Sequence, residues 1–438
     1  MANVFISCSI LFFMVEIDAK AGDLIKLRLA REELECTLLE SHDSGILLVK
    51  LKSGYNIGVP RENVFDCEVI KKYEQKKGEK KEEKTEEKYK ENRLKIGLVI
   101  TGGTIASKLD SRTGGGSALS DMSEFRKFYP HLFKICDVKV EVPFMKLSEN
   151  INSEDWIKIG ECVKKLIDDK DIKGVIIAHG TDTLHYTSSA LSFFLGNLNK
   201  PVVLTYAQRS IDRASSDADL NLRCAARFAL SDCAGVYVVG HADLNDDYCY
   251  ALLGTKVRKL HTSRRDAFKA VNTNVIAKVW PDKIEFLSSF KARHDKNVEL
   301  DAVFNDKVAL VKFYPGQSAD IVDYYRMHGY KGLVIEVLGL GGLPVGEHSN
   351  WLAAFKKAIR EGMVICGASQ TIYGRLNAKV YSGSRELEKA GMIFLEDMLS
   401  ECALVKLGWV LGHRGWKASA REKMLENVAG EFNKLLTE

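Results

Sequence analysis

Hydrophobic and polar residues alternate in short runs between Ala21 and Ile70, as in Ile25-Lys26-Leu27-Arg28-Leu29 and Val49-Lys50-Leu51-Lys52. A period of two is typical of β-strands that bury one face. Turn residues at Asp43-Ser44-Gly45 and Ser53-Gly54 separate the runs. Because short strands joined by turns commonly form small barrels, we predict a small, partly open β-barrel domain over residues 1–70.

Residues 71–92 have no hydrophobic periodicity. Between Lys71 and Lys90 the segment contains nine lysines and six glutamates. Such a composition offers no apolar face to bury and is typical of a solvated linker. The pattern therefore predicts a charged linker that follows the barrel.

After Asn92, short and continuous apolar runs replace the alternation. They are Ile96–Ile100, Val175–Ala178, Val202–Thr205 and Val236–Val239. Between the first two runs, Asn152 is a suitable N-cap for a helix whose apolar residues, from Trp156 to Ile167, share one face. Apolar strands that alternate with helices indicate a parallel sheet covered on both faces. We therefore predict an α/β domain over residues 93–290.

A second series of the same kind follows a charged, less periodic connection between Lys283 and Asp306. Its apolar runs are Val308–Phe313, Leu333–Val337 and Met363–Cys366. This pattern predicts a smaller C-terminal α/β domain over residues 306–438. The predicted fold class is thus α/β, with two parallel α/β domains preceded by a small β-barrel.

The charge balance disfavours a protein that holds nucleic acid alone. Lysine and arginine total 63 against 59 acidic residues, a net charge of +4, and the segment from Lys71 to Lys90 contributes +3 of it. The remaining chain is close to neutral, whereas nucleic-acid binding domains are strongly basic. Any binding of nucleic acid is therefore expected to depend on a partner.

Two further features indicate a cytoplasmic protein without membrane association. The longest apolar stretch near the start, Val4–Phe13, is too short to span a bilayer and lacks the basic residues that open a signal peptide. The ten cysteines are scattered without a C-x-x-C pair, which favours reduced thiols and disfavours a zinc site.

Candidate chemistry lies directly after two predicted strands. Thr101-Gly102-Gly103-Thr104-Ile105-Ala106 follows the first strand, and His179-Gly180-Thr181-Asp182-Thr183 follows the second. Ligands of parallel sheets bind beyond the carboxyl ends of the strands. Neither segment is a complete phosphate-binding or dinucleotide-binding fingerprint, which disfavours nucleotide binding.

A threonine hydroxyl becomes a nucleophile only when a base removes its proton. A lysine can act as that base, and Lys256, Lys259 and Lys269 all follow the fourth strand. Composition does not choose among these three lysines.

The two strand-end motifs, about 75 residues apart and in this order, resemble the two signatures of the bacterial-type L-asparaginase family. The resemblance extends from about Lys95 to the C-terminus and implies an asparaginase-like two-domain core. It implies that Thr104 is the nucleophile and that Thr181, Asp182 and Lys259 form its proton-relay group. Ser148 resembles the serine that contacts the α-amino acid end of the substrate.

Further motifs resemble one branch of that family, the glutaminase subunits of archaeal tRNA-dependent amidotransferases. They are the barrel and linker, Ala207-Gln208-Arg209-Ser210, Ser369-Gln370, Ile372-Tyr373-Gly374-Arg375 and Ala403-Leu404-Val405-Lys406-Leu407. The resemblance implies that glutamine is hydrolysed and that its ammonia passes to a tRNA-binding kinase/transferase partner, the amidotransferase E subunit, which converts Glu-tRNA(Gln) into Gln-tRNA(Gln). It also implies a homodimer within a heterotetramer, ATP and Mg used by the partner, and no cofactor bound by this chain.

The sequence departs from the family pattern at two places. Ser111 and Arg112 precede the Thr113-Gly114 turn, where the family has a catalytic-loop tyrosine, and Tyr206 stands where a glycine is usual. Two alternatives therefore stay open, a free L-asparaginase with an appended N-terminal domain and a non-catalytic scaffold that keeps the fold. The sequence alone does not choose between glutamine and asparagine as substrate.

Overall fold

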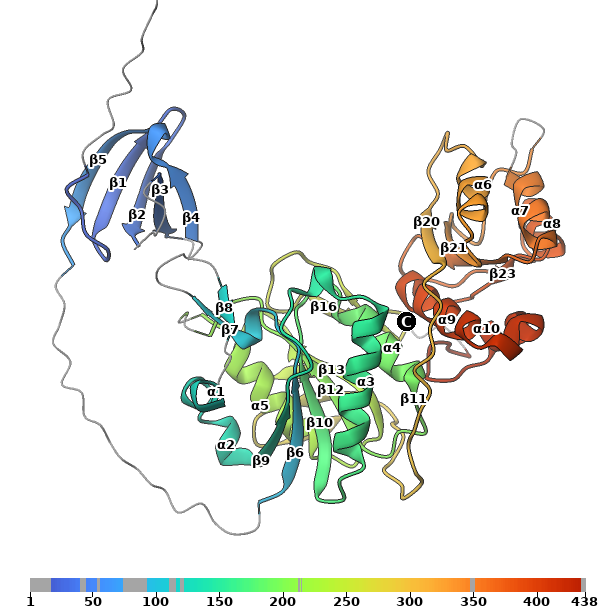
Figure 1. Cartoon of the computed structure of the whole chain (residues 1–438), viewed down its shortest axis with the longest axis horizontal. Helices are drawn as coiled ribbons and strands as arrows, with labels where there is room; N and C mark the ends of the chain where they lie inside the picture. Colours follow the sequence, from blue (N-terminus) through green and yellow to red (C-terminus); the bar gives the residue numbers. More distant parts are fainter. Residues whose placement is uncertain are drawn as a thin grey trace, which may run out of the picture. The chain divides into compact units, whose positions relative to one another are not determined.

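The computed structural model describes residues 17–39, 45–52, 56–73, 93–109, 116–118, 122–211, 213, 215–346 and 351–434. The described residues fall into two units: those within 1–90 and 108–117 form the first, and those within 91–107 and 118–438 form the second (Figure 1). The apolar segment 4–13, most of the charged linker and the Thr113-Gly114 turn lie outside the described residues.

The first unit contains a five-stranded antiparallel sheet with the order β4-β3-β2-β1-β5. Its strands are β1 (Leu24–Leu29), β2 (Glu33–Leu38), β3 (Ile46–Leu51), β4 (Asn56–Pro60) and β5 (Val64–Lys71), with η1 (Arg61–Asn63) between the last two. Ile25, Leu27 and Val49 are completely buried, as the alternation predicts. Strands β4 and β5 are the two edges, so the sheet is open.

An eight-stranded sheet organises the first half of the second unit, with the order β18-β17-β14-β13-β12-β10-β6-β9. The strands are β6 (Lys95–Ile100), β9 (Asp137–Glu141), β10 (Ile172–Ala178), β12 (Pro201–Thr205), β13 (Gly235–His241), β14 (Cys249–Leu253), β17 (Ala277–Val279) and β18 (Ile284–Phe286). From β9 to β13 the pairs are parallel, which confirms the predicted parallel core.

The last three strands of this sheet, β14, β17 and β18, are antiparallel, which the apolar runs did not predict. Only residues 242–248 connect β13 to β14. Such a connection can form a hairpin, whereas a crossover to a parallel strand needs a dozen or more residues. The sheet is therefore mixed.

Helices bury both faces of the sheet (Figure 1). Apolar residues of α5 (Ala218–Ala229) pack on one face, and those of α3 (Ser153–Ile167) and α4 (Leu184–Phe194) pack on the other. As predicted, Asn152 caps α3, because its side chain accepts from the backbone N–H of Asp155 while the Asp155 carboxylate accepts from the N–H of Asn152. The remaining helices here are α1 (Met122–Phe128), α2 (Leu132–Ile135), η2 (Thr104–Ala106) and η3 (Ser148–Asn150).

A four-stranded parallel sheet forms the C-terminal domain, with the strands β20 (Val308–Lys312), β21 (Gly332–Val337), β22 (Val364–Ser369) and β23 (Ile393–Phe394). Its helices are α6 (Asp320–Met327), α7 (Trp351–Arg360), α8 (Ser382–Lys389), α9 (Ser400–Gly412), η4 (Arg414–Ser419) and α10 (Ala420–Leu425). The Trp409 ring of α9 stacks on the Phe193 ring of α4, with centroids 5.6 Å apart. The two α/β domains therefore share a hydrophobic core within one unit.

Three small two-stranded sheets complete the structure. They pair β7 (Ser107–Leu109) with β8 (Gly116–Ala118), β11 (Leu195–Gly196) with β19 (Glu299–Leu300), and β15 (Val257–Lys259) with β16 (Phe268–Ala270). Within the described residues, every helix is too short or too polar to span a bilayer.

Candidate active site

The first strand-end motif is held against the neighbouring strand by its backbone. After β6, the N–H and the hydroxyl of Thr101 both donate to the carbonyl of Ala178, at 3.1 and 3.0 Å. Gly102 has a φ of 118°, and a Cβ atom there would lie 2.2 Å from the Lys146 carbonyl oxygen. Only glycine fits this conformation and this approach. The backbone then turns into η2, whose first residue is Thr104.

The second motif touches the first through glycine. A Cβ atom on Gly103 would lie 2.4 Å from the Cα atom of Gly180. Strands β6 and β10 are parallel neighbours, so both motifs leave the same edge of the sheet. Thr104 and Thr181, which directly follow these glycines, therefore lie on adjacent turns.

Lys259, at the end of β15, joins the second motif. Its Nζ atom donates to Thr181 Oγ1 and to Asp182 Oδ1, at 2.8 Å in both cases. The Lys259 side chain is only 11% exposed, whereas that of Asp182 is 64% exposed. Lys256 instead binds Asp397, and Lys269 binds Asp266. Of the three lysines that composition left open, Lys259 is the one that reaches the strand-end motifs.

Ser148 lies beneath the same turn and is buried. Its hydroxyl accepts from the backbone N–H of Asp182 at 3.1 Å, and its carbonyl accepts from the Thr183 hydroxyl at 2.7 Å. A Cβ atom on Gly180 would lie 2.8 Å from the Ser148 hydroxyl oxygen. Ser148, Thr181, Asp182 and Lys259 thus form one hydrogen-bonded group, called the lysine group below.

Thr104 is near this group but is not hydrogen-bonded into it. Among the described residues, its side chain makes no hydrogen bond, although its carbonyl accepts from the N–H of Ser107. Its side chain is half-buried. The connection between Thr104 and the lysine group is the Gly103–Gly180 backbone contact.

An open surface pocket of about 340 Å³ adjoins the group and is lined by Asp182, Lys259, Leu260, His261 and Thr262. Two of its lining residues belong to the lysine group itself. A small polar substrate therefore has space beside the Lys259 amine.

Two buried histidines near the group are neutral at physiological pH. Burial lowers the pKa of His179 to about 4, and the Nδ1 atom of His179 donates to the Gly180 carbonyl at 2.7 Å. Burial, together with the charges of Arg258 and Lys259, lowers the pKa of His185 to about 3. Because the Gly180 carbonyl can only accept, His179 shapes its turn as a neutral donor.

The local sequence patterns did not reveal that Lys146 and Asp155 support the site. Lys146 donates its backbone N–H to Thr101 at 2.9 Å, and its amine binds the buried Asp155 carboxylate at 2.7 Å. These residues can be recognised by a buried charge next to a motif. Burial of a charge can be read only from the tertiary structure.

Tyr206 stands where the family usually has a glycine, and its ring fits because the neighbouring residue Gly240 has no side chain. A Cβ atom on Gly240 would lie 2.4 Å from the Tyr206 ring. The ring contacts Phe268 of β16 with centroids 4.6 Å apart, and its hydroxyl donates to the Arg265 carbonyl at 3.0 Å. Tyr206 therefore packs against the hairpin that carries Lys259.

Known families match the chain along most of its length. Residues 95–291 match the family described as Asparaginase, N-terminal, and residues 307–425 match the Glutaminase/Asparaginase C-terminal domain. Residues 19–70 match the GatD N-terminal domain.

Solved structures resemble the second unit. The thermostable L-asparaginase from Thermococcus kodakarensis has a TM-score of 0.70 and 32% identity, covering 78% of this chain and 100% of that chain. L-asparaginase I from Vibrio cholerae has a TM-score of 0.68 and 25% identity, with the same coverage. The fold and the matched families define a protein with an asparaginase-type amidohydrolase domain.

Curated relatives extend the match to the first unit. The D subunit of glutamyl-tRNA(Gln) amidotransferase from Pyrococcus abyssi is 44% identical over 429 residues, which are 96% of each chain. The D subunit of the same enzyme from Pyrococcus furiosus is 46% identical over 395 residues, covering 90% of this chain and 89% of the other. This chain belongs to the D-subunit family of glutamyl-tRNA(Gln) amidotransferases.

Proposed function

We propose that this chain is the glutaminase component of a glutamyl-tRNA(Gln) amidotransferase and that Thr104 is its nucleophile. The observation that carries the proposal is the Lys259 amine, which donates to both Thr181 and Asp182 beside the turn that begins with Thr104. The full-length similarity to amidotransferase D subunits supports the same function.

In the proposed reaction, the Thr104 hydroxyl oxygen attacks the side-chain amide carbon of glutamine. The hydroxyl proton is removed by the Lys259 amine, directly or through Thr181, and then passes to the departing nitrogen, which leaves as ammonia. Water hydrolyses the resulting ester, releasing glutamate and restoring Thr104. Asp182 orients Lys259, and proton transfer by a positioned group of this kind contributes about 10² to 10⁴ in rate.

The remaining parts of the site would bind the substrate and stabilise developing charge. Backbone N–H groups at the glycine-rich turns after β6 and β10 are candidate donors to the oxyanion, each contributing roughly 10² to 10³ in rate. Ser148 is proposed to contact the α-amino acid end of glutamine. No cofactor is required of this chain in the scheme.

The ammonia is proposed to pass to a partner, the amidotransferase E subunit, which would use ATP and Mg to activate Glu-tRNA(Gln) in the cytoplasm. The names of the relatives and the N-terminal family match support this assignment. So does the nearly neutral charge outside the linker, which leaves tRNA binding mainly to the partner. We propose a homodimer of this chain within a heterotetramer.

An ammonia-release assay tests the proposal on glutamine and asparagine, with and without the E subunit and glutamyl-tRNA(Gln). We expect glutamine hydrolysis that the partner and its tRNA stimulate. Thr104→Val should abolish it, while Thr104→Ser, which keeps a hydroxyl, should retain part of it. Normal activity of Thr104→Val would rule out the nucleophile.

The second candidate is a free L-asparaginase with an appended N-terminal domain. It is favoured by the full coverage of the Thermococcus kodakarensis L-asparaginase at 32% identity. Fast asparagine hydrolysis by the isolated chain would support this candidate. Absence of turnover with either amide under every condition would instead indicate a non-catalytic scaffold.

A further inference from the structure

The hairpin that carries Lys259 is too small to hold its own position. Strands β15 and β16 have three residues each, and Lys259 pairs with Phe268 at their end. An isolated two-stranded hairpin is at best marginally stable in water, so its position depends on the groups that hold it. The Lys259 amine must nevertheless lie within hydrogen-bonding distance of a turn that follows another strand.

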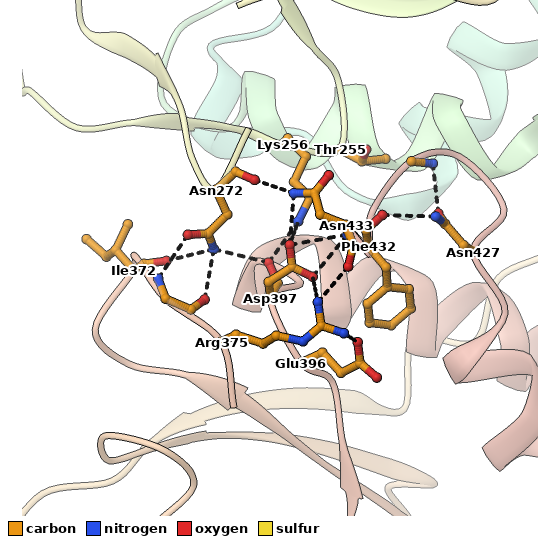
Figure 2. Close-up of polar contacts among 12 residues, drawn as sticks. Thr255, Lys256, Asn272, Ile372, Arg375, Glu396, Asp397, Asn427, Phe432 and Asn433 are labelled. Carbon is orange, nitrogen blue, oxygen red and sulfur yellow. Dashed lines mark hydrogen bonds and ion pairs between the residues drawn. The ribbon is translucent and has the colours of Figure 1, made fainter. Parts of the chain in front are cut away.

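The residue before β15 is anchored to the C-terminal domain. Lys256 and Asp397 form an ion pair in which both side chains are 0% exposed. The Lys256 amine donates to the Asp397 carboxylate at 2.8 Å and to the Asp397 carbonyl at 2.9 Å (Figure 2). Burial lowers the pKa of Lys256, and the hydrogen bond to Asp397 opposes that shift.

The chain that follows β16 is anchored at the same place. The Asn272 side chain accepts from the Gly374 N–H at 2.9 Å and donates to the carbonyls of Gly374 and Asp397, at 3.2 and 3.3 Å. Its own carbonyl accepts from the Asn433 side chain, which also donates to the Asp397 carboxylate at 2.9 Å (Figure 2). Asp397 is therefore hydrogen-bonded to residues on both sides of the hairpin, Lys256 before β15 and Asn272 after β16.

A third contact lies beside the lysine itself. The Arg258 guanidinium binds the Glu401 carboxylate of α9 at 2.8 Å, and Glu401 is buried. The hairpin is therefore held by the C-terminal domain before β15, within β15 and after β16.

We infer that Lys256, Asn272 and Asp397 are positioning residues that hold Lys259 against Thr181 and Asp182 by fastening both ends of the β15–β16 hairpin to the C-terminal domain. The inference rests on the proposed function, in which Lys259 moves the proton. Misplacement of a reacting group by about 1 Å can cost on the order of 10² in rate, so loss of an anchor should lower kcat.

Asn272→Gly is the most selective test. Asn272 has a φ of 55°, a conformation that glycine adopts without strain, so the change removes the side-chain bonds and keeps the backbone. Asn197→Gly is the matched control, because Asn197 has a φ of 53° and is exposed elsewhere on the domain. Both variants are assayed with the E subunit and glutamyl-tRNA(Gln).

Two readouts separate positioning from general damage. We expect Asn272→Gly to lower kcat for glutamine by about tenfold or more, with KM within about twofold of the parent value. We also expect the Lys259 amine to be acetylated several-fold faster by acetic anhydride, measured by mass spectrometry, because it loses its partners. Asn197→Gly should match the parent protein in both measurements.

If Asn272→Gly does not fold, Lys256→Met carries the same test, since Asp397 keeps its Asn433 donors. Acetylation and kcat equal to those of Asn197→Gly would overturn the inference. Lys259→Met distinguishes the two proposals. Normal hydrolysis by Lys259→Met would defeat the proposed role of Lys259 in proton transfer, whereas the acetylation rates would still decide whether the anchors position the hairpin.

Discussion

The backbones of Gly103 and Gly180 are in direct contact, since a Cβ atom on Gly103 would lie 2.4 Å from Cα and 2.6 Å from N of Gly180. The residues are 77 positions apart in the chain, as are the hydrogen-bonded Thr101 and Ala178 that precede them. This contact sets the distance between the turns of Thr104 and Thr181. The first prediction concerns this contact.

Gly103→Ala should separate the two turns. The added methyl group meets backbone atoms that cannot rotate away, and the φ of 76° adds strain. We expect a loss of stability of about 1 to 3 kcal/mol. Glutamine hydrolysis should fall by about 10² because Thr104 moves relative to the lysine group.

Gly316→Ala is the control for this change. Gly316 has a φ of 85°, and a Cβ atom there would meet nothing within 4 Å. Gly316→Ala therefore introduces the same kind of backbone strain without a clash against another backbone. Its activity should equal that of the parent. Equal activity of the two variants would show that the Gly103–Gly180 contact is unimportant.

Ser148→Ala should weaken substrate binding and disturb the Asp182 turn. The substitution removes the acceptor of the Asp182 N–H, and loss of one such part-buried hydrogen bond costs about 0.5 to 1.5 kcal/mol. We expect KM for glutamine to rise and kcat to fall, as measured in steady-state ammonia release. Unchanged values of both constants would contradict the role of Ser148.

Lys259→Met should reduce glutamine hydrolysis by at least about 10², because it removes the proposed base. Lys269→Met is its control on the same hairpin, where Lys269 binds Asp266 instead of the threonine turn. We expect Lys269→Met to keep most of the parental kcat. If Lys269→Met were the inactive variant, the assignment of the catalytic lysine would be wrong.

His179 should make the protein sensitive to acid. Its pKa is about 4 in the folded chain against an ordinary value of 6.5. Between these values the unfolded chain binds the proton and the folded chain does not, so acidification favours unfolding. The free energy of unfolding is lowered by about 3 kcal/mol near pH 4, and this loss is absent above pH 6.5.

His179→Asn should reduce this acid sensitivity, because asparagine can still donate to the Gly180 carbonyl but does not titrate. The measurement is the difference in denaturation midpoint between parent and variant as a function of pH. As the pH falls from 6.5 to about 4, we expect the denaturation midpoint of the parent to decrease more than that of His179→Asn. A difference independent of pH would exclude His179 as the cause.

Asn152→Ala should loosen the first turn of α3. Loss of an N-cap side chain costs about 0.5 to 2 kcal/mol, and here it also breaks the reciprocal bond with Asp155. We expect faster hydrogen exchange at the Asp155 amide, whereas Asn152→Asp should retain protection because a carboxylate can accept the same bond. Equal exchange in all three proteins would argue against the cap.

Local patterns predicted much of the architecture. The alternation around Ile25 and Leu27, the apolar strands from β6 to β13 and the Asn152 cap all depend on residues within a few positions of one another. Such patterns record which face of a strand or helix is buried. They did not predict the antiparallel β14, β17 and β18, because these strands lie outside the predicted apolar runs and follow one another without intervening helices.

The sequence by itself determined the alternating strands of the first unit, the main apolar strands of the two α/β domains, the helix capped by Asn152, the two hydroxyl-bearing motifs and a short set of candidate lysines. Composition left those lysines open, the family resemblance pointed to Lys259, and the tertiary structure shows that Lys259 is the one hydrogen-bonded to Thr181 and Asp182. Lys256, Lys259 and Lys269 have the same side chain and lie within 14 residues, so composition does not separate them. What separates them is their long-range partners: Asp397 lies 141 residues from Lys256, and Thr181 lies 78 residues from Lys259. Contacts across such separations form only when the sheet and the C-terminal domain are packed together, which is why Lys259 alone reaches the threonine turn.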